Sequence, residues 1–335
     1  MTLTGQVRLW NLSDPHHPAI STSLGTADFP TLAGFYVGPG VTSDAAGDLV
    51  AVVGSGALHL WRITDAIDAV AAGSLPVPAA ANNFAGVLGN HTAMVATTAG
   101  FDWWDVSNPD HPVRAGSSSV AAASTDTKAK QDGVVMNSAT TGGAVLAADT
   151  TNQVSCQCRW LLFRFGANAG PTARVTLPGA VGSVLSPSND NRLLASDSSN
   201  ANVVTLWDIS DPQHPQPRSS ILALEGIRGI TFDPADRVMA VWNNDTVQLW
   251  DIHNRTSPNL EASYKPADGS IATAAFSLTQ PTLLLATNGT VSMLDMDPAK
   301  LADHLCQYTG GAPLTASQWQ RYAPGIAPQD PCLRH

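Results

Sequence analysis

The stretch that decides the fold is "TVQLWDI", residues 246–252, in which apolar and polar side chains alternate up to a Trp-Asp pair. Alternation with a period of two is typical of a β-strand. Related stretches recur along the chain, and such self-similarity indicates a repeat architecture. They are "QVRLWNL" with Trp10, "ALHLWRI" with Trp61, "FDWWDVS" with Trp104, "VVTLWDIS" with Trp207 and "TVSMLDM", in which Leu294 takes the Trp position.

The spacing of these stretches is close to regular. Successive Trp positions from Trp10 to Leu294 lie 51, 43, 103, 43 and 44 residues apart. The long interval divides into 59 and 44 at "CRWLLFRF", where Phe163 would occupy the Trp position. The sequence therefore predicts one large all-β body built from seven copies of one unit, rather than the two domains that 335 residues ordinarily suggest.

One period, residues 226–264, gives the order of elements within the unit. Four short strands separated by turn sequences predict a four-stranded antiparallel meander. In the first turn Pro234 presets φ, and Asp233 and Asp236 can bond to nearby backbone. "SPSNDNR" at 186–192 and "SDAAGD" at 43–48 take the same place in other copies. The strands are "IRGITF", "VMAVW", "TVQLWDI" and "NLEASY", and the turns are "DPADR", "NND" and "HNRTSP".

The third strand is apolar on both faces, at Val247, Leu249, Trp250 and Ile252. A sheet that is buried on both faces must lie between neighbouring layers. Radially packed blades of a β-propeller satisfy this requirement and leave only the outer strands as edges.

The chain resembles the WD-repeat β-propellers, through the period, the "LWD" strand ends and the "FDPADR" turn. The turns "SDPHHP", "SNPDHP" and "SDPQHP" are similar to those of bacterial members, and the tail "LCQYTGGAPLTASQWQRYAPGIAPQDPC" resembles the segment that closes many such chains. The Gly-His dipeptide common in the family is absent from every repeat. The resemblance covers roughly residues 6–296 and the tail. It implies a structural, repeat-motif role for Trp10, Trp61, Trp104, Trp207, Asp208, Trp250 and Asp251.

The first strand, "QVRLWNL", is a third strand whose blade lacks its first two strands. We expect "PAISTSL", residues 18–24, to complete residues 271–296 as an outer strand, which gives six full blades. The first strand is then a remnant that exposes Val7, Leu9 and Trp10. The alternative is that residues 6–24 form a partial seventh blade. We expect residues 1–296 to form the propeller and residues 297–335 to dock on it as a short tail, because the tail carries Leu314, Trp319 and Tyr322.

No residue type with catalytic, cofactor-binding or metal-binding spacing stands out. The histidines of the "DPHHP", "PDHP" and "PQHP" turns follow different Trp strands, so a turn role is favoured over a metal site. Neither a GxGxxG loop nor a GxSxG elbow occurs. Cys156 and Cys158 fit small core residues, whereas Cys306 and Cys332 could form a disulfide, although a cytoplasmic location favours thiols. The turn histidines are His16, His17, His111 and His214.

The irregular stretch is residues 116–133, "GSSSVAAASTDTKAKQDG", which lengthens one period to 59 residues. Insertions in repeat arrays map to exposed loops, often on the binding face. We expect a solvated loop. The more specific alternative is a loop that docks a partner.

Charge and hydropathy exclude two classes of partner. The net charge is −10, and only four of the 17 basic residues are lysines, so no basic stripe is available for nucleic acid. No apolar run reaches the length of about 18 residues that a membrane helix needs. The N-terminus also lacks the pattern of a secretory signal, so we expect a cytoplasmic location.

These observations favour a non-catalytic scaffold or sensor module that binds protein partners. The expected innermost strands, "AGFYV", "FAGVL", "AVGSV", "IRGIT" and "IATAAF", carry one charge, Arg228, which is no acid/base set. The competing hypothesis is a propeller enzyme with its substrate site in the central funnel. A third is that the array is the sensory end of a longer regulator.

Overall fold

A computed structural model describes most of the repeat region. The described residues are 6–11, 19–26, 31–32, 35–36, 41–44, 47–65, 68–77, 85–88, 91–97, 100–119, 134–138, 144–149, 159–165, 171–177, 184–198, 201–211, 213–267, 269–277, 280–287, 290–297 and 315. They form strands and turns, and none of them lies in a helix.

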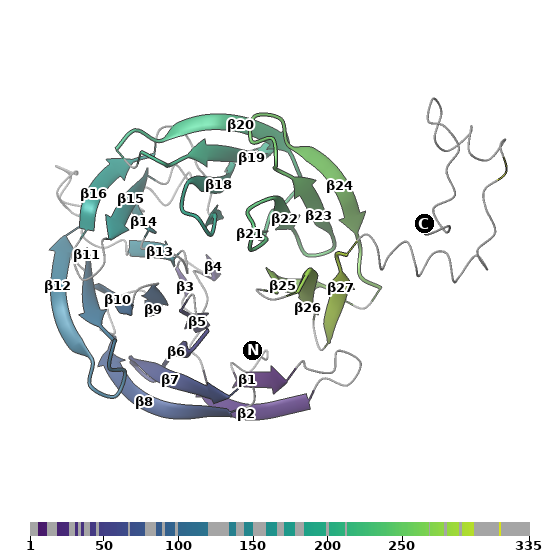
Figure 1. The fold of residues 1–335 in the computed structure, drawn as a ribbon. Coiled ribbons are helices and arrows are strands. Elements are labelled where there is room, and N and C mark those ends of the chain that lie inside the picture. The colour runs from purple at the N-terminus through teal and green to yellow at the C-terminus, as the bar shows by residue number, and fades with distance from the viewer. Residues whose placement is uncertain are drawn as a thin grey trace, which may run out of the picture.

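The strands form an all-β propeller in which small sheets are arranged around a central axis (Figure 1). Five sheets are four-stranded, and each is an antiparallel meander whose strand order follows the chain. We number them blades I to V. Blade I holds β5 (Val41–Ser43), β6 (Leu49–Gly54), β7 (Ala57–Asp65) and β8 (Asp68–Pro76). Blade II holds β9 (Ala85–Leu88), β10 (Thr92–Thr97), β11 (Gly100–Asp105) and β12 (Val113–Ser119). Blade III holds β13 (Val134–Ser138), β14 (Ala144–Asp149), β15 (Arg159–Phe165) and β16 (Pro171–Thr176).

Blades IV and V follow the same pattern. Blade IV holds β17 (Leu185–Pro187), β18 (Leu193–Ser198), β19 (Ala201–Asp208) and β20 (Gln216–Leu222). Blade V holds β21 (Gly229–Phe232), β22 (Val238–Trp242), β23 (Val247–Asp251) and β24 (Asn259–Tyr264), which are the strands expected from the sequence of one period. Phe163 lies on the third strand of blade III.

Three smaller sheets complete the described strands. A three-stranded sheet holds β25 (Ile271–Phe276), β26 (Thr282–Thr287) and β27 (Val291–Asp295). A two-stranded ribbon holds β1 (Gln6–Asn11) and β2 (Ala19–Thr26), and a short pair holds β3 (Thr31–Leu32) and β4 (Phe35–Tyr36). In the ring the β1–β2 ribbon lies between the β25–β27 sheet and blade I (Figure 1).

The prediction of six full blades is wrong for the part of the chain that the structure describes, where five sheets have four strands. "PAISTSL" does not complete the last blade, because Ile20 pairs with Trp10 and Ala19 with Asn11 in the β1–β2 ribbon. Strands that follow one another along the chain pair more readily than strands from opposite ends. The pairing agrees with the alternative in which residues 6–24 belong together.

The first strand is also less exposed than expected. Val7 is buried at 4% exposure and packs with Leu24, Val50 and Val52, whereas Trp10 is exposed as predicted. The β1–β2 ribbon therefore takes the place of a neighbouring blade against blade I.

Two further expectations need correction. "AGFYV" is no innermost strand, because Phe35–Tyr36 pairs with Thr31–Leu32 and blade I begins at Val41. The irregular stretch begins later than residue 116, since residues 116–119 belong to β12. Residues 120–133, and the tail except Asp297 and Thr315, lie outside the described residues.

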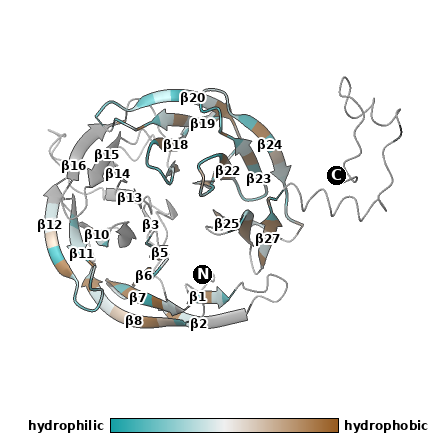
Figure 2. Cartoon of the chain, viewed as in Figure 1, coloured by the Kyte–Doolittle hydropathy of each residue, from teal (hydrophilic) through white to brown (hydrophobic). Residues whose placement is uncertain are grey.

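The hydrophobic core lies between neighbouring blades. One cluster joins Val204 and Leu206 of blade IV to Phe232, Met239 and Trp250 of blade V. The next joins blade V to the β25–β27 sheet. Hydrophobic and hydrophilic residues are interspersed around the ring rather than gathered on one side (Figure 2). Burial of one Leu or Val side chain contributes about 1.5–3 kcal/mol to the free energy of folding. Because these side chains are buried between blades, each blade depends on its neighbours for stability.

Candidate interaction surface

Two sets of turns share one face of the ring. In an antiparallel meander, the turn between strands one and two and the turn between strands three and four open on the same side. We call this side the double-turn face. Its first turns include 44–49, 188–193 and 233–238, and its third turns include 105–113, 208–216 and 251–259.

Each described third turn begins with the aspartate that ends the third strand. Asp208 Oδ1 accepts the backbone N–H of Ser210 at 2.9 Å, and Asp251 Oδ1 accepts that of His253 at 2.8 Å. Asp105 and Asp295 do the same with Ser107 and Asp297. Such Asx turns fix the chain as it leaves the Trp strand. The carboxylate of the Trp-Asp pair therefore organises a turn.

Asp208 shows how strongly these carboxylates are engaged. Bonds from Ser210 and from the Arg218 guanidinium lower the pKa of Asp208 to about 2. The Arg218 Nε donates a hydrogen bond to Asp208 Oδ2 at 3.0 Å. The pKa of Asp105 is also lowered, chiefly by the Ser107 hydroxyl. Both groups are ionised at neutral pH and are unsuited to act as a general base near pH 7.

The turn histidines form further hydrogen bonds within the same third turns. His214 donates its backbone N–H to Asp211 O at 3.1 Å, and its Nδ1 lies 2.8 Å from Asp211 Oδ2. His111 donates its backbone N–H to Asn108 O in the equivalent position. His16 and His17 lie outside the described residues. Across the described ranges no three His, Cys, Asp or Glu side chains group as metal ligands.

The first turns are closed by side chains at one repeated position. Asp44 Oδ1 and Ser188 Oγ accept the backbone N–H groups of Leu49 and Leu193, five residues on. Asp233 Oδ1 accepts that of Val238 at 2.6 Å. Because a short acceptor is required there, the sequence uses Asp or Ser.

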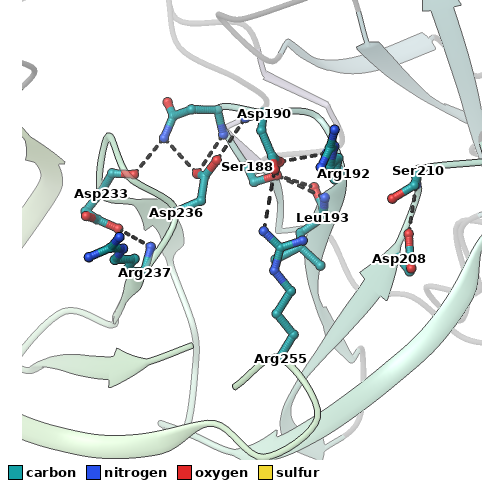
Figure 3. Close-up of polar contacts among 11 residues, drawn as sticks. Ser188, Asp190, Arg192, Leu193, Asp208, Ser210, Asp233, Asp236, Arg237 and Arg255 are labelled. Carbon is teal, nitrogen blue, oxygen red and sulfur yellow. Dashed lines mark hydrogen bonds and ion pairs between the residues drawn. The ribbon is translucent and has the colours of Figure 1, made fainter. Parts of the chain in front are cut away.

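Blades IV and V are joined through these first turns (Figure 3). Asp236 is 6% exposed and accepts the backbone N–H groups of Asn189 and Asp190, both at 2.8 Å. The Asn189 amide also donates to Asp233 O at 2.7 Å. Arg255, from the third turn of blade V, reaches Asp190 at 3.4 Å. We call these contacts the blade clasp.

Opposing effects set the pKa values within the blade clasp. Burial raises the pKa of Asp236 despite the bonds from Asn189 and Asp190. Burial also tends to raise the pKa of Asp190. Hydrogen bonds from the Ser188 hydroxyl and the Arg192 backbone amide, together with the positive charge of Arg255, outweigh burial, so the pKa is lowered.

Blades I and II are joined on the same face by other residues. Gly73 of β8 donates its N–H to Pro109 O at 2.7 Å, and Arg62 forms an ion pair with Asp110 at 2.7 Å. A Cβ on Gly73 would lie 2.5 Å from Pro109 O, so only glycine fits. The third turn of one blade thus docks on the outer strands of the blade before it.

The Trp positions differ in their surroundings. Trp207 and Trp250 are 7% and 8% exposed, whereas Trp10 is 44% exposed. The Trp207 Nε1 donates to Ser196 Oγ at 2.9 Å, whereas the Nε1 atoms of Trp61 and Trp104 are buried without a hydrogen-bond partner. Val52 and Val95 occupy the register position of Ser196 in blades I and II and offer no acceptor.

Two unusual side chains lie toward the opposite face, where second strands end. Asp197 of β18 and Trp242 of β22 occupy the same register position in neighbouring blades, opposite Val184 and Gly229. Burial raises the pKa of Asp197 to about 6, although its carboxylate accepts the Val184 N–H at 2.8 Å. The Trp242 indole packs over Gly229 and its Nε1 is buried without a partner. Neither residue was singled out from the sequence, because neither follows the repeat pattern.

No protein-family model matches the chain, and no curated protein sequence matches it. The fold is similar to that of the β-propeller domain of Cps50 (Swd1) from Myceliophteria thermophila, at a TM-score of 0.60 and 11% identity over 88% of this chain and 91% of that one. It is similar to a chain of the mitotic checkpoint complex, at 0.57 and 12% over 88% and 85%. It is also similar to Sqt1 from Saccharomyces cerevisiae, at 0.52 and 12% over 88% and 78%. At these identities the likeness shows that the chain has a β-propeller fold.

Proposed function

We propose that the chain is a non-catalytic, cytoplasmic protein-interaction scaffold or sensor module of bacterial WD-repeat type. The observation that carries the proposal is the chemistry of the innermost strands. The six described first strands are β5, β9, β13, β17, β21 and β25, and none contains an Asp, Glu, His, Lys, Arg, Cys or Tyr residue. Acid/base catalysis in the centre of the ring needs such groups.

The described surface also favours binding over chemistry. On the double-turn face the carboxylates of Asp105, Asp208 and Asp251 are occupied by their own turns. A rigid ring with closed turns presents its remaining side chains in fixed positions, which lowers the entropy cost of binding a partner. One structural neighbour comes from the mitotic checkpoint complex, an assembly of proteins. The described part of the chain has no helix able to cross a membrane.

The test uses the full chain as bait, followed by direct binding of each retained protein in purified form. Two variants separate the faces: Arg192→Glu with Arg237→Glu on the double-turn face, and Glu225→Lys with Arg228→Glu on the opposite face. We expect one pair to weaken binding about tenfold or more while the other pair and both melting temperatures stay unchanged. If no purified protein binds, or if both pairs act alike, the proposal is wrong.

One observation supports the second candidate, a propeller enzyme. The raised pKa of Asp197, about 6, suits a general base, and this residue lies next to the last residue of a second strand, toward the face opposite the double turns. Turnover of a substrate that is abolished in Asp197→Asn, in a variant that melts normally, would favour the enzyme over the scaffold.

A further inference from the structure

The outer edge of β27 differs from its equivalents in the five blades. In blades I to V the third strand pairs with a fourth strand on its outer side. The β25–β27 sheet ends at β27, and no strand among the described residues pairs with its outer edge. Proteins cover or protect such edges because the free N–H and C=O groups otherwise recruit another strand.

One face of β27 is also less covered than the same face of its equivalent in blade V. Val291 occupies the register position of Val247 in blade V, since their partners Ala286 and Trp242 are equivalent. Val247 is fully buried because the β25–β27 sheet packs on this face of blade V, whereas Val291 is 44% exposed. Val291–Asp295 contains no Lys, Arg or Pro that would discourage strand pairing. Among the described residues, the outer edge of β27 is therefore unpaired and unprotected, and the face that carries Val291 is only partly covered.

The chain that follows is placed to cover this edge. Asp295 accepts the N–H of Asp297 at 2.9 Å, as Asp208 and Asp251 do at the start of their third turns. In blades IV and V that turn brings the chain back along the outer edge of the same third strand. After the β25–β27 sheet, 38 residues follow Asp297 along the chain. They include the apolar residues Leu301, Leu305, Leu314, Trp319 and Tyr322.

We propose that residues 298–335 cover the outer edge of β27 and pack on Val291. The tail is the favoured occupant because its linkage to β27 gives it an effective concentration of about millimolar or more, which a second copy in dilute solution lacks. This inference is independent of the proposed function. It also removes the β27 edge from the surface that is available to a protein partner.

Hydrogen exchange of the full chain tests the proposal. Every second amide of an edge strand points away from the sheet. We expect these amides in β27 to exchange about tenfold or more slowly than those of β24, whose outer edge is exposed, at every protein concentration. Equal exchange in β27 and β24 would overturn the proposal. Protection that grows with concentration, together with a dimer by light scattering, would overturn it in favour of a second copy.

A matched pair of variants tests the contact on Val291. Val291 and Leu260 are 44% and 42% exposed and lie on β27 and β24. In Val291→Asp a charge lies beneath the tail, so limited proteolysis should cleave residues 298–335 about tenfold or more faster than in the parent chain. Leu260→Asp should leave that rate unchanged. Equal rates in all three proteins would overturn the proposal.

Discussion

At the scale of single residues, burial separates tryptophans that the repeat pattern makes equivalent. Trp250 packs between blades IV and V, whereas Trp10 lies at the surface of a two-stranded ribbon. The repeat pattern predicts where a strand lies and which of its side chains share a face. It does not record whether a neighbouring blade covers the side chain.

Trp250→Ala should therefore cost about 3–5 kcal/mol of unfolding free energy, because it leaves a cavity between two blades. Trp10→Ala, at 44% exposure, should cost about 1–2 kcal/mol. Denaturant unfolding of both variants measures the difference. Equal losses would mean that the two side chains are covered to the same extent.

Asp197 gives the stability a pH dependence. Its folded-state pKa of about 6 lies above the ordinary value of 3.8, so the native state holds this proton more tightly than the unfolded chain does. The resulting stabilisation is complete below about pH 4 and is lost as the pH rises through 6. Asp197→Asn should match the parent at pH 4 and be roughly 1–3 kcal/mol more stable at pH 8.

Melting temperatures at the two pH values provide the measurement, with Asp245→Asn, at an exposed turn, as the control. If Asp197→Asn is destabilised equally at both pH values, the carboxylate is held by contacts rather than by burial.

At the scale of elements, the turns join the blades as well as closing them. Asp236 adopts a φ of 54° and uses its carboxylate in the blade clasp. Asp236→Gly keeps the backbone conformation without strain but removes the acceptor, so it should cost about 1–3 kcal/mol. Asp236→Asn retains one acceptor oxygen and should lose less. The reverse order in thermal melts would show that the backbone, not the carboxylate, decides stability.

The sequence predicted the elements better than their partners. The strands of blade V and the acceptor Asp233 in its first turn were expected because periodicity and turn chemistry act within a few residues, whereas the Asp236 carboxylate bonds to the neighbouring blade IV and not to nearby backbone as predicted. The blade clasp was not expected, because Asn189 and Asp236 meet across 47 residues. The favoured pairing of residues 18–24 with residues 271–296 was wrong, since an alternating strand fits the edge of any third strand and only the fold decides between the two arrangements.

At the scale of the whole molecule, the β1–β2 ribbon determines how blade I is covered. Leu24 is 2% exposed and packs with Val7, Val50 and Val52. Leu24→Ala should therefore cost about 2–4 kcal/mol, although this residue lies near the chain end. Thr22→Ala on the same strand should cost less than about 1 kcal/mol. A negligible loss for Leu24→Ala in denaturant unfolding would mean that the ribbon is not part of the folded ring.

The blade clasp has a consequence for how such a ring can change in size. Asn189 and Asp190 are the donors in one first turn, and Asp236 is the acceptor in the next. The two turns are not interchangeable, because the position of Asn189 is taken in blade V by Pro234, which has no N–H, and the position of Asp236 is taken in blade IV by Asn191. A duplicated blade V would therefore inherit the acceptor for the blade that precedes it, but not the donor Asn189 for the blade that follows. Gene duplication of this blade alone would thus copy the means of joining on one side only.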